Sequence, residues 1–454
     1  MEKSVMSDRI IILFDQYSVE SQLLHESFIQ TGCECLAISL EENDFLPSAV
    51  TSVYDMISGD FWIEEEKRGC PRYFNEIAVP DNWSIHAGDK SVGNITYQHE
   101  EKGKIYYLQS EKHHLVEAVD WYDRKGCVRF RDHYNRYGNI CARTVYDGNG
   151  KELCKSRFSK SGKEFITENF VTGDIILNYD DVMKIFRSKQ ELTGYWFNRE
   201  GLGKNRIFYN SLVDSFFISN RLGGVERKDI LFWQKSLCQD TLENMRMILG
   251  ATSGRMDKIM VQKRSVYEKI SEFDLDKSRV GKLGYIYSFK KENAHKPEAF
   301  IFTHSDKIEH CEELIQRFPQ MHFHIAAITA MSSKLIKLEN YNNVSLYPGA
   351  GKQVQDRLFL TCDYYFDINY MSEVRSAVYQ AFLHNQLIFA FQETIHNKEY
   401  VLQDLIYPVA EFDRMVSDLK VVMEDVGIME QRLKEQRKYA LAESKETYVD
   451  LLGL

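Results

Sequence analysis

The sequence predicts an α/β protein in which two doubly wound, Rossmann-type domains are combined with an inserted antiparallel β-meander. Three observations support this fold class. Apolar runs of strand length alternate with helical segments near both ends of the 454-residue chain. In between, this alternation stops and a turn motif recurs every 12 residues. The alternation then resumes, which indicates that the meander interrupts the first α/β domain.

The first α/β domain is expected to begin with a strand at 9–14, a helix at 18–30 and a strand at 35–40. Ser18 can cap this helix, because its hydroxyl can accept a bond from a free backbone N–H of the first turn. After the meander, strands are expected at 206–209, 216–219 and 230–233. We assign two separate segments to this domain, 1–45 and 182–280.

The meander is predicted from four copies of one motif: an aromatic residue, a small polar residue, two variable residues and glycine. The copies lie at 122–126, 134–138, 146–150 and 158–162. Asp, Asn or Ser at the second position can bond to its own backbone, and glycine supplies the positive φ that closes a turn. One short strand fits between successive turns. Residues 46–181 are therefore assigned to an inserted extended β-sheet domain.

Polar and apolar residues are mixed between these turns, which suits a sheet with much of both faces in contact with water. Such a sheet can hold another molecule, or it can serve only as a spacer. It carries no paired acid, base or nucleophile and is not expected to catalyse. The residues expected at a surface for a partner or an acceptor are Tyr122, Tyr134, Arg136, Tyr137 and Tyr146.

A second α/β domain is expected at 281–425, followed by a charged C-terminal helix at 426–454. Its predicted strands are 299–303, 322–328, 344–347, 364–368 and 387–391. Its predicted helices are 306–317, 354–361 and 373–383. Two doubly wound domains with a long terminal helix are the layout of GT-B glycosyltransferases, whose ligands bind between the domains at the carboxyl ends of the strands. The predicted fold is therefore GT-B-like.

Composition argues against several classes of protein. A formal charge of −10 is unlike that of a nucleic-acid-binding protein. No apolar run approaches the ~20 residues that cross a bilayer, and no charged-then-apolar leader opens the chain. The nine cysteines include no C-x-x-C pair, a pattern typical of reduced cytosolic thiols and not of a zinc site. We expect a cytoplasmic protein with at most peripheral contact with the cytoplasmic face of the cell membrane.

The sharpest functional motif lies at 367–382. Retaining GT-B transferases carry two glutamates eight residues apart here, one near the donor sugar and one at the nucleotide ribose. Glu373 matches the first, whereas Ala381, or Gln380 after a one-residue gap, stands in place of the second. The Gly-Phe-Gly that normally follows the first glutamate is replaced by Val-Arg-Ser at 374–376, although close approach of backbone to phosphate needs residues without Cβ. The sequence resembles a sugar-nucleotide site that has lost its working parts.

Two weaker motifs are better explained by a structural role than by a functional one. The Gly-Ala-Gly-Lys string at 349–352 lacks the Ser or Thr and the upstream glycine of a phosphate loop, which favours a glycine-rich turn. His322 and His324 alternate on a predicted strand, as a metal-binding pair would. Without a third ligand nearby, they are better explained as a pair at the edge of the core.

Several long strings resemble one known family closely. They are VDWYD at 119–123, DHYNRYG at 132–138, ENFVTGDIIL at 168–177, RIFYNSL at 206–212, SNRL at 219–222 and HFHIAA at 322–327. They resemble the accessory Sec system glycosylation chaperone of Gram-positive cocci and lactobacilli. That protein is the B subunit of the O-linked N-acetylglucosaminyltransferase acting on serine-rich repeat adhesins. The resemblance covers nearly the whole chain, except the first eight residues.

The resemblance implies a GT-B fold with an inserted extended β-sheet domain. It also implies a heterotetramer with two catalytic A subunits, which hold the UDP-N-acetylglucosamine, so no cofactor is expected in this chain. The B subunit of the family stabilises the A subunit and grips the unfolded adhesin before export by accessory Sec components.

We therefore expect an acceptor-binding and stabilising subunit without catalytic or metal-binding residues of its own. A shallow, extended surface suits a long disordered acceptor, because many modest contacts must offset its ordering entropy. The polar residues expected in an interdomain cleft are Asn210, Ser211, Asn220, Arg221, Asn369, Glu373 and Arg375. One alternative is an independently active GT-B glycosyltransferase with a divergent donor site. Another is a purely structural scaffold.

Overall fold

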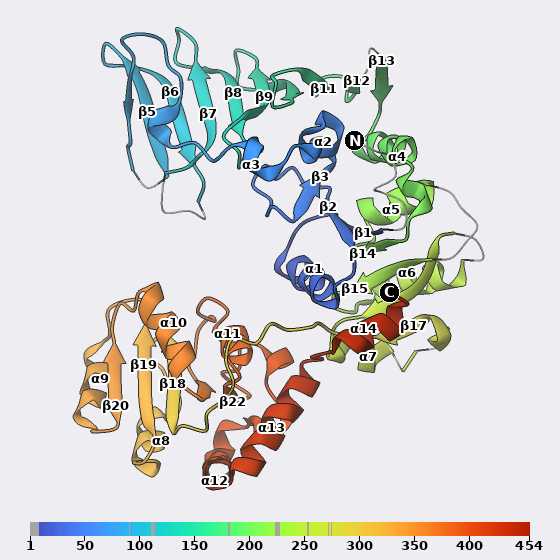
Figure 1. Ribbon diagram of the computed structural model, residues 1–454. Helices are drawn as coiled ribbons and strands as arrows, with labels where there is room; N and C mark the ends of the chain where they lie inside the picture. Colours follow the sequence, from blue (N-terminus) through green and yellow to red (C-terminus); the bar gives the residue numbers. More distant parts are fainter. Residues whose placement is uncertain are drawn as a thin grey trace. The chain divides into compact units, whose positions relative to one another are not determined.

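The computed structural model describes residues 9–89, 91–109, 114–179, 182–222, 228–251, 254–270, 272–273 and 275–454. Within these ranges it contains two α/β sheets and one ten-stranded antiparallel sheet (Figure 1), which confirms the predicted fold class. The chain divides into two compact units, and each is described by itself. The first comprises the residues up to His25, Glu34–Phe232 and Gly250–Ile259. The second comprises Glu26–Cys33, Trp233–Leu249 and Met260–Leu454.

The N-terminal α/β sheet has the strand order β17-β16-β15-β14-β1-β2-β3, and β15, β14, β1, β2 and β3 pair in parallel. The strands are β1 (Ile10–Phe14), β2 (Cys35–Ser39), β3 (Val50–Ser52), β14 (Ile207–Tyr209), β15 (Asp229–Trp233), β16 (Met256–Val261) and β17 (Val280–Lys282). The helices are α1 (Val19–Thr31), α2 (Val53–Ser58), α3 (Glu65–Arg68), α4 (Lys189–Arg199), α5 (Asp214–Arg221), α6 (Gln239–Gly250) and α7 (Arg264–Ile270). All five residues of β1 are buried, because a central parallel strand is covered on both faces.

The strand predicted at 216–219 is wrong, since these residues belong to helix α5. A short apolar run cannot by itself distinguish a strand from a buried helix. The helix begins where the Asp15 carboxylate, at the end of β1, accepts a 2.7 Å bond from the backbone N–H of Ser215. Because the capping residue comes from a distant part of the chain, the local sequence pattern could not predict the start of this helix.

The ten-stranded sheet has the order β13 to β4, and each strand pairs antiparallel with the next. Its strands are β4 (Ser84–His86), β5 (Val92–Tyr97), β6 (Glu100–Tyr107), β7 (Val116–Tyr122), β8 (Val128–Tyr134), β9 (Ile140–Tyr146), β10 (Glu152–Phe158), β11 (Glu164–Asn169), β12 (Ile175–Tyr179) and β13 (Val182–Phe186). The predicted meander is confirmed, and it extends beyond the four repeats on both sides. A small apolar cluster around Ile95, Ile105 and Val119 covers one face of β5 to β7.

The four repeat turns share one geometry. Their glycines have φ between 74° and 82°, the left-handed region that costs a residue without Cβ little. The Oδ1 atoms of Asp123, Asn135 and Asp147 each accept bonds from two backbone N–H groups within their own turns. The local chemistry predicted from the motif is therefore confirmed for these three turns, whereas in the fourth the Ser159 hydroxyl bonds to the Ser161 hydroxyl at 2.8 Å.

The second unit is built around a parallel sheet of order β20-β19-β18-β21-β22-β23. Its strands are β18 (Glu298–Thr303), β19 (His322–Ala327), β20 (Val344–Tyr347), β21 (Tyr364–Asp367), β22 (Leu387–Phe391) and β23 (Ile406–Tyr407). Its helices are α8 (Cys311–Arg317), α9 (Ser333–Ile336), α10 (Lys352–Thr361), α11 (Ala377–Leu383), α12 (Phe412–Glu424), α13 (Val426–Tyr439) and α14 (Lys445–Leu452). The five strands predicted for this domain are confirmed.

The charged C-terminal segment is not one continuous helix. It consists of α13 and α14, separated by a break in which Leu441 has a positive φ of 53°. Left-handed residues cannot continue a right-handed helix. Ser444 then starts α14 by accepting a 3.2 Å bond from the backbone N–H of Thr447.

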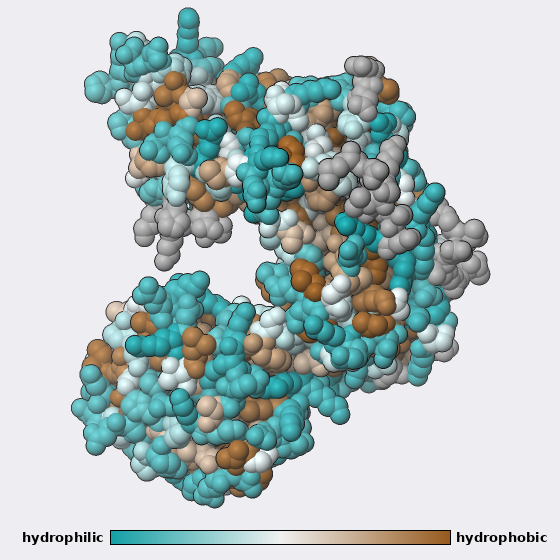
Figure 2. Space-filling view, viewed as in Figure 1, coloured by the Kyte–Doolittle hydropathy of each residue, from teal (hydrophilic) through white to brown (hydrophobic). Residues whose placement is uncertain are grey.

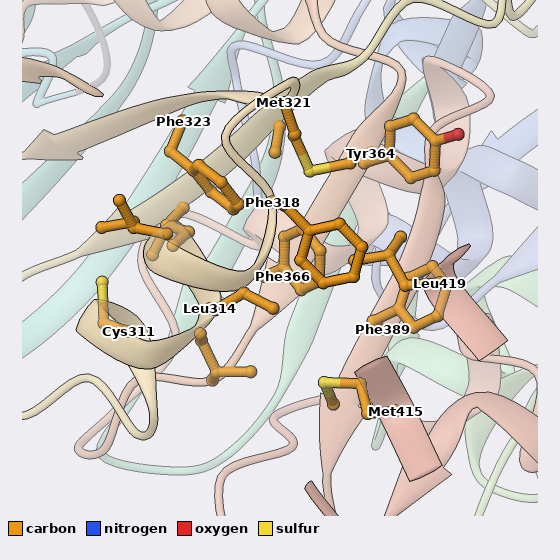
Figure 3. Close-up of a cluster of buried hydrophobic side chains, with 14 of the residues drawn as sticks. Cys311, Leu314, Phe318, Met321, Phe323, Tyr364, Phe366, Phe389, Met415 and Leu419 are labelled. Atoms are coloured by element: carbon orange, nitrogen blue, oxygen red, sulfur yellow. The ribbon is translucent and has the colours of Figure 1, made fainter. Parts of the chain in front are cut away.

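Helices α8, α12 and α13 pack on one face of the second unit's sheet and enclose its core (Figure 3). Phe366 and Phe389 stack with ring centroids 5.6 Å apart. Phe318, directly after α8, and Leu419 from α12 are fully buried against them. Each such side chain contributes ~1.5–3 kcal/mol through burial, which gives the nearby loops a rigid base.

Polar residues cover most of the visible surface, with small apolar patches between them (Figure 2). Within the part of the chain that the structure describes, no helix is both long and apolar enough to cross a membrane.

Candidate functional site

The loop after β21 carries three of the predicted site residues. Asn369 is 1% exposed, and its Oδ1 has no hydrogen-bond partner among the described residues. The Oε1 of Glu373 accepts a 2.9 Å bond from the backbone N–H of Val378, so Glu373 caps α11. Arg375 is exposed, and its Nη1 donates to Oε1 of Gln355 at 3.0 Å. The Nδ2 of Asn369 donates to the carbonyl oxygen of Tyr370 at 3.4 Å, so the structure places the three residues on one loop and gives each of them an intramolecular partner.

The same loop keeps a glycine-like backbone without glycine. Arg375 and Ser376 have φ of 48° and 53°, in the left-handed region. The helix expected at 373–383 therefore begins only at Ala377, which corrects the predicted boundary. Their side chains stand where GT-B transferases were expected to carry a Gly-Phe-Gly string.

The position of the missing second carboxylate lies on α11. Ala381 is fully buried, and Gln380 is half-buried. A carboxylate at 381 would lie in the apolar core without a partner, which is costly. Helix α11 therefore offers a ribose no carboxylate at either position.

A buried pair beneath this loop was missed by the sequence reasoning. The Nδ1 of His396 lies 2.5 Å from Oδ1 of Asp367, and its Nε2 lies 2.8 Å from the carbonyl oxygen of Met371. Burial lowers the pKa of His396, but the hydrogen bond to Asp367, the charges of Asp367 and Glu373 and the bond to the Met371 carbonyl together outweigh burial and leave this pKa raised. The pair ties the loop to β21. Its partners are far apart in the sequence, so no spacing signal could reveal it.

Two more predicted residues lie at the end of β14, in the first unit. Asn210 donates from Nδ2 to Oγ of Ser21 at 2.8 Å. The Oγ of Ser211 accepts from the backbone N–H of Val213 at 3.3 Å. Asp15, which was missed, lies at the end of the adjacent strand β1, and its Oδ2 is buried without a hydrogen-bond partner among the described residues.

Asn220 and Arg221 lie at the opposite end of α5 from these residues. Both are exposed, and Asn220 donates to the carbonyl oxygen of Phe216 in its own helix. At 1.5 Å per residue, α5 separates the two pairs by about 10 Å. The structure therefore does not gather these four residues at one point. A cleft that collects all seven predicted residues from both units stays a prediction.

The second and fourth repeat turns pack against residues 43–70, and we name them the docked turns. The backbone N–H of Arg136 donates to the carbonyl oxygen of Asp44 at 3.0 Å. The Tyr137 hydroxyl accepts a 2.9 Å bond from Arg68. In the fourth turn, the backbone N–H of Lys160 donates to the Asp60 carboxylate at 2.9 Å.

The part of the sheet that carries the docked turns, which we name the docked side, is held in place by a buried cluster of charged side chains. Arg157 is 2% exposed, and its Nη2 lies 3.0 Å from Oε2 of Glu42. Its guanidinium lies 3.7 Å from the ring centroid of Tyr54, whose pKa burial raises to about 12. Burial alone would raise the pKa of Glu42, but Arg157 and Lys155 hold it well below its usual range. This cluster joins the sheet to the loop after β2.

The first and third turns, 123–126 and 147–150, are the free turns. Their hydrogen bonds, among the described residues, run within the turns or to neighbouring strands. Tyr122 and Tyr146, at the start of these turns, are partly exposed. Tyr134, at the start of a docked turn, is only 6% exposed. The five residues expected at one sheet surface are thus divided between two environments.

The repeat also carries a ladder of ion pairs. Asp120 accepts two bonds from Arg131, at 2.6 and 2.8 Å, and Asp132 accepts two from Arg143, at 2.6 and 3.1 Å. Both aspartates are at most 3% exposed. The two acids are 12 residues apart, and so are the two arginines. Comparing the strands of successive repeats, and not only their turns, would have revealed these two ion pairs.

The glycine-rich string and the histidine pair, the two weaker motifs, both have structural roles. The 349–351 string forms a turn between β20 and α10, as expected, with Gly349 at φ 59°. His322 bonds to Ser345 at 2.8 Å, and His324 lies 2.7 Å from Glu298. No metal-binding group of three or more such side chains is found among the described residues.

Comparison with known proteins bears on the whole chain. Family models match at 11–56 (GtfB N-terminal domain), 83–187 (GtfB middle domain), 189–273 (GtfB third domain) and 299–436 (GftB/GlyA-F C-terminal domain). The chain is 39% identical to the UDP-N-acetylglucosamine–peptide N-acetylglucosaminyltransferase stabilizing protein GtfB of Streptococcus agalactiae, over 98% of this chain and 99% of that protein. It is 36% identical to GtfB of Streptococcus gordonii over the same shares of the two chains.

A solved structure agrees with these matches. It is described as the crystal structure of a GtfA/B complex bound to UDP and GlcNAc, and one of its chains is 35% identical to this chain. The two superpose with a TM-score of 0.79 over 98% of this chain and 99% of that one. The chain therefore belongs to the GtfB family of stabilising proteins of O-GlcNAc transferases.

Proposed function

We propose that this chain is the non-catalytic subunit that stabilises a GtfA-type O-GlcNAc transferase and holds its Ser/Thr-rich acceptor. One observation carries the non-catalytic part: α11 presents buried Ala381 and uncharged Gln380 where a nucleotide-binding carboxylate would stand. Arg375 and Ser376 add side chains where phosphate would need bare backbone. Glu373 is already engaged as a helix cap.

The assembly and the acceptor belong to the same proposal. The related solved structure is described as a GtfA/B complex, which supports a catalytic GtfA-type partner, and we propose a heterotetramer of two chains of each kind. The acceptor would be a serine-rich repeat adhesin, modified in the cytoplasm before export by accessory Sec components. The complex would work in the cytosol, at or near the cytoplasmic face of the membrane.

The acceptor role is supported by the form of the molecule. A ten-stranded sheet with partly exposed tyrosines offers many shallow contacts, which suits a long disordered chain. The loop after β21 could add contacts to acceptor sugars or peptide amides.

The test is transfer of N-acetylglucosamine to an acceptor fragment by the purified chain, by its GtfA-type partner and by both together. We expect turnover only when the partner is present, and acceptor binding by the chain alone. Gln380→Glu should create no activity, because the loop still lacks its glycines. Transfer by the isolated chain would overturn the proposal in favour of an active transferase.

A further inference from the structure

The loop after β21 has a backbone conformation that its residues do not favour. Met371, Arg375 and Ser376 have φ of 81°, 48° and 53°, so three residues with a Cβ lie in the left-handed region close together. Each of them costs free energy and persists only where surrounding contacts fix the backbone. The conformation of this loop therefore depends on the bonds that tie it to the rest of the second unit.

The first of these left-handed residues is tied down by His396. The Nε2 of His396 lies 2.8 Å from the carbonyl oxygen of Met371. The side chain of Met371 adds little packing, because the residue is 70% exposed. The preceding residue, Tyr370, bonds through its hydroxyl to Glu309 at 2.7 Å. His396 thus supplies a fixed contact at the point where the backbone first turns into the left-handed region.

Both ring nitrogens of His396 face hydrogen-bond acceptors. Nδ1 lies 2.5 Å from Oδ1 of Asp367, and Nε2 faces the Met371 carbonyl oxygen, which can only accept. The Oδ2 of Asp367 accepts a 2.7 Å bond from the backbone N–H of His396. A neutral imidazole carries one N–H, whereas an imidazolium carries two. With Asp367 ionised, only the protonated ring can donate to Asp367 and to the loop at the same time.

The surroundings of the ring favour this proton. The side chains of His396 and Asp367 are 9% and 1% exposed, and their bond is strengthened by the low local dielectric. The charged groups that act on His396 are Asp367 and Glu373, and Tyr365 of β21 is kept neutral because burial raises its pKa. Burial lowers the pKa of His396, but the two acids and the Met371 carbonyl together leave this pKa above its ordinary value of 6.5.

We propose that the proton on Nε2 of His396 is a latch for the loop after β21. While the ring carries both protons, it joins Asp367 to the Met371 carbonyl oxygen and holds the loop in its left-handed conformation. When one proton passes to water, the remaining N–H stays on Nδ1, because a carboxylate is the stronger acceptor. Nε2 then presents a lone pair to the carbonyl oxygen, the bond to the loop is lost, and the loop is released.

The raised pKa of His396 sets the direction of the pH effect. The tie is complete below pH 6.5 and is lost as the pH rises through the raised pKa. Mild alkali should therefore loosen the loop and leave the sheet beneath it intact. The latch makes the arrangement of the polar residues on this loop, Asn369, Glu373 and Arg375, depend on pH.

The test is amide hydrogen exchange of the full chain at about pH 6 and about pH 9, corrected for the intrinsic effect of pH. Protection of residues 369–376 should fall about ten- to a hundredfold at the higher pH, as expected for the loss of one charge-assisted bond. Protection of β18, β21 and β22 should not change. His396→Gln removes the titrating group, so its loop should be poorly protected at both pH values. In NMR spectra, the His396 ring signal, identified by its absence from this variant, should titrate with a midpoint above 6.5.

His304→Gln is the matched control, because the Nε2 of His304 lies 3.3 Å from the Ser372 hydroxyl in the same loop. This variant should keep the pH dependence of the wild type. Equal loop protection at both pH values in the wild type, an unchanged pH dependence in His396→Gln, or a midpoint at or below 6.5 would overturn the latch. A loss of protection spread over the whole second unit would also overturn it. If His396→Gln does not fold, the wild type and His304→Gln still decide, since both must lose protection in the loop alone.

Discussion

The free turns and the docked turns are copies of one motif with different surroundings. Both kinds close with a left-handed glycine, and their Asp or Asn side chains bond to the backbone in the same way. The docked turns contact residues 43–70 through Arg136, Tyr137 and Lys160. The free turns leave Tyr122 and Tyr146 accessible.

The difference follows from the direction of the strands. In an antiparallel meander each repeat runs opposite to the one before, so alternate turns lie at opposite ends of the sheet. Successive repeats also use opposite faces: Asp132 pairs with Val119, the neighbour of Asp120, and side chains alternate along a strand. Copies of one sequence motif therefore form one end of the sheet that packs against residues 43–70 and an opposite end that remains open.

The largest effect is expected for Arg157→Met, which should destabilise the docked side. The substitution leaves Glu42 and Asp44 without their buried partner, so we expect a loss of ~3–5 kcal/mol in the free energy of unfolding. Urea-induced unfolding measures the loss, and amide exchange should locate it in β9 to β11. Arg129→Met, beside a free turn, is the control and should change stability by less than ~0.5 kcal/mol. Equal effects would contradict the assignment of a docked and a free side.

Mild acid should weaken the docked side before the free turns. Burial lowers the pKa of His133, on the face that carries Arg157, to about 4. An unfolded histidine binds its proton near pH 6.5, so stability should fall as the pH drops from 6.5 to 4, by up to about 3 kcal/mol. Backbone N–H groups lower the pKa values of Asp123 and Asp147, so the free turns should hold over this range.

Unfolding curves at several pH values between 7 and 4 test this expectation. The variant His133→Gln removes the titrating group, and its stability should depend less on pH than that of the wild type. Parallel pH curves for the two proteins would show that His133 does not link acid to the docked side.

Replacing a turn glycine with alanine should have a smaller effect on stability, and the loss should differ between a docked turn and a free turn. A Cβ at Gly138, in a docked turn, would lie 2.3 Å from the carbonyl oxygen of Cys70, whereas a Cβ at Gly126 meets open space. Gly126→Ala should cost ~1 kcal/mol for its left-handed φ. Gly138→Ala should cost ~2–4 kcal/mol, because steric overlap is added. The midpoints of thermal unfolding measure both, and equal shifts would argue against packing of the docked turn.

Much of the fold could be predicted from local patterns. The strands of the second unit were found because buried parallel strands are continuous apolar runs. The repeat turns were found because glycine and Asp or Asn have defined roles in them. Prediction failed at 216–219 and at 373–376, where the cap from Asp15 and the left-handed Arg375 and Ser376 decided the local structure.

The sequence by itself determined the meander, its turn chemistry and the loss of the second carboxylate at Gln380 and Ala381. These depend on residue types and short spacings, which act before the chain has packed. Only the tertiary structure decided which repeats are docked, how Arg157 meets Glu42, and how Asp367 and His396 tie down the loop after β21. Those contacts join residues far apart in the chain, and their strength comes from burial, which no local pattern of residues contains.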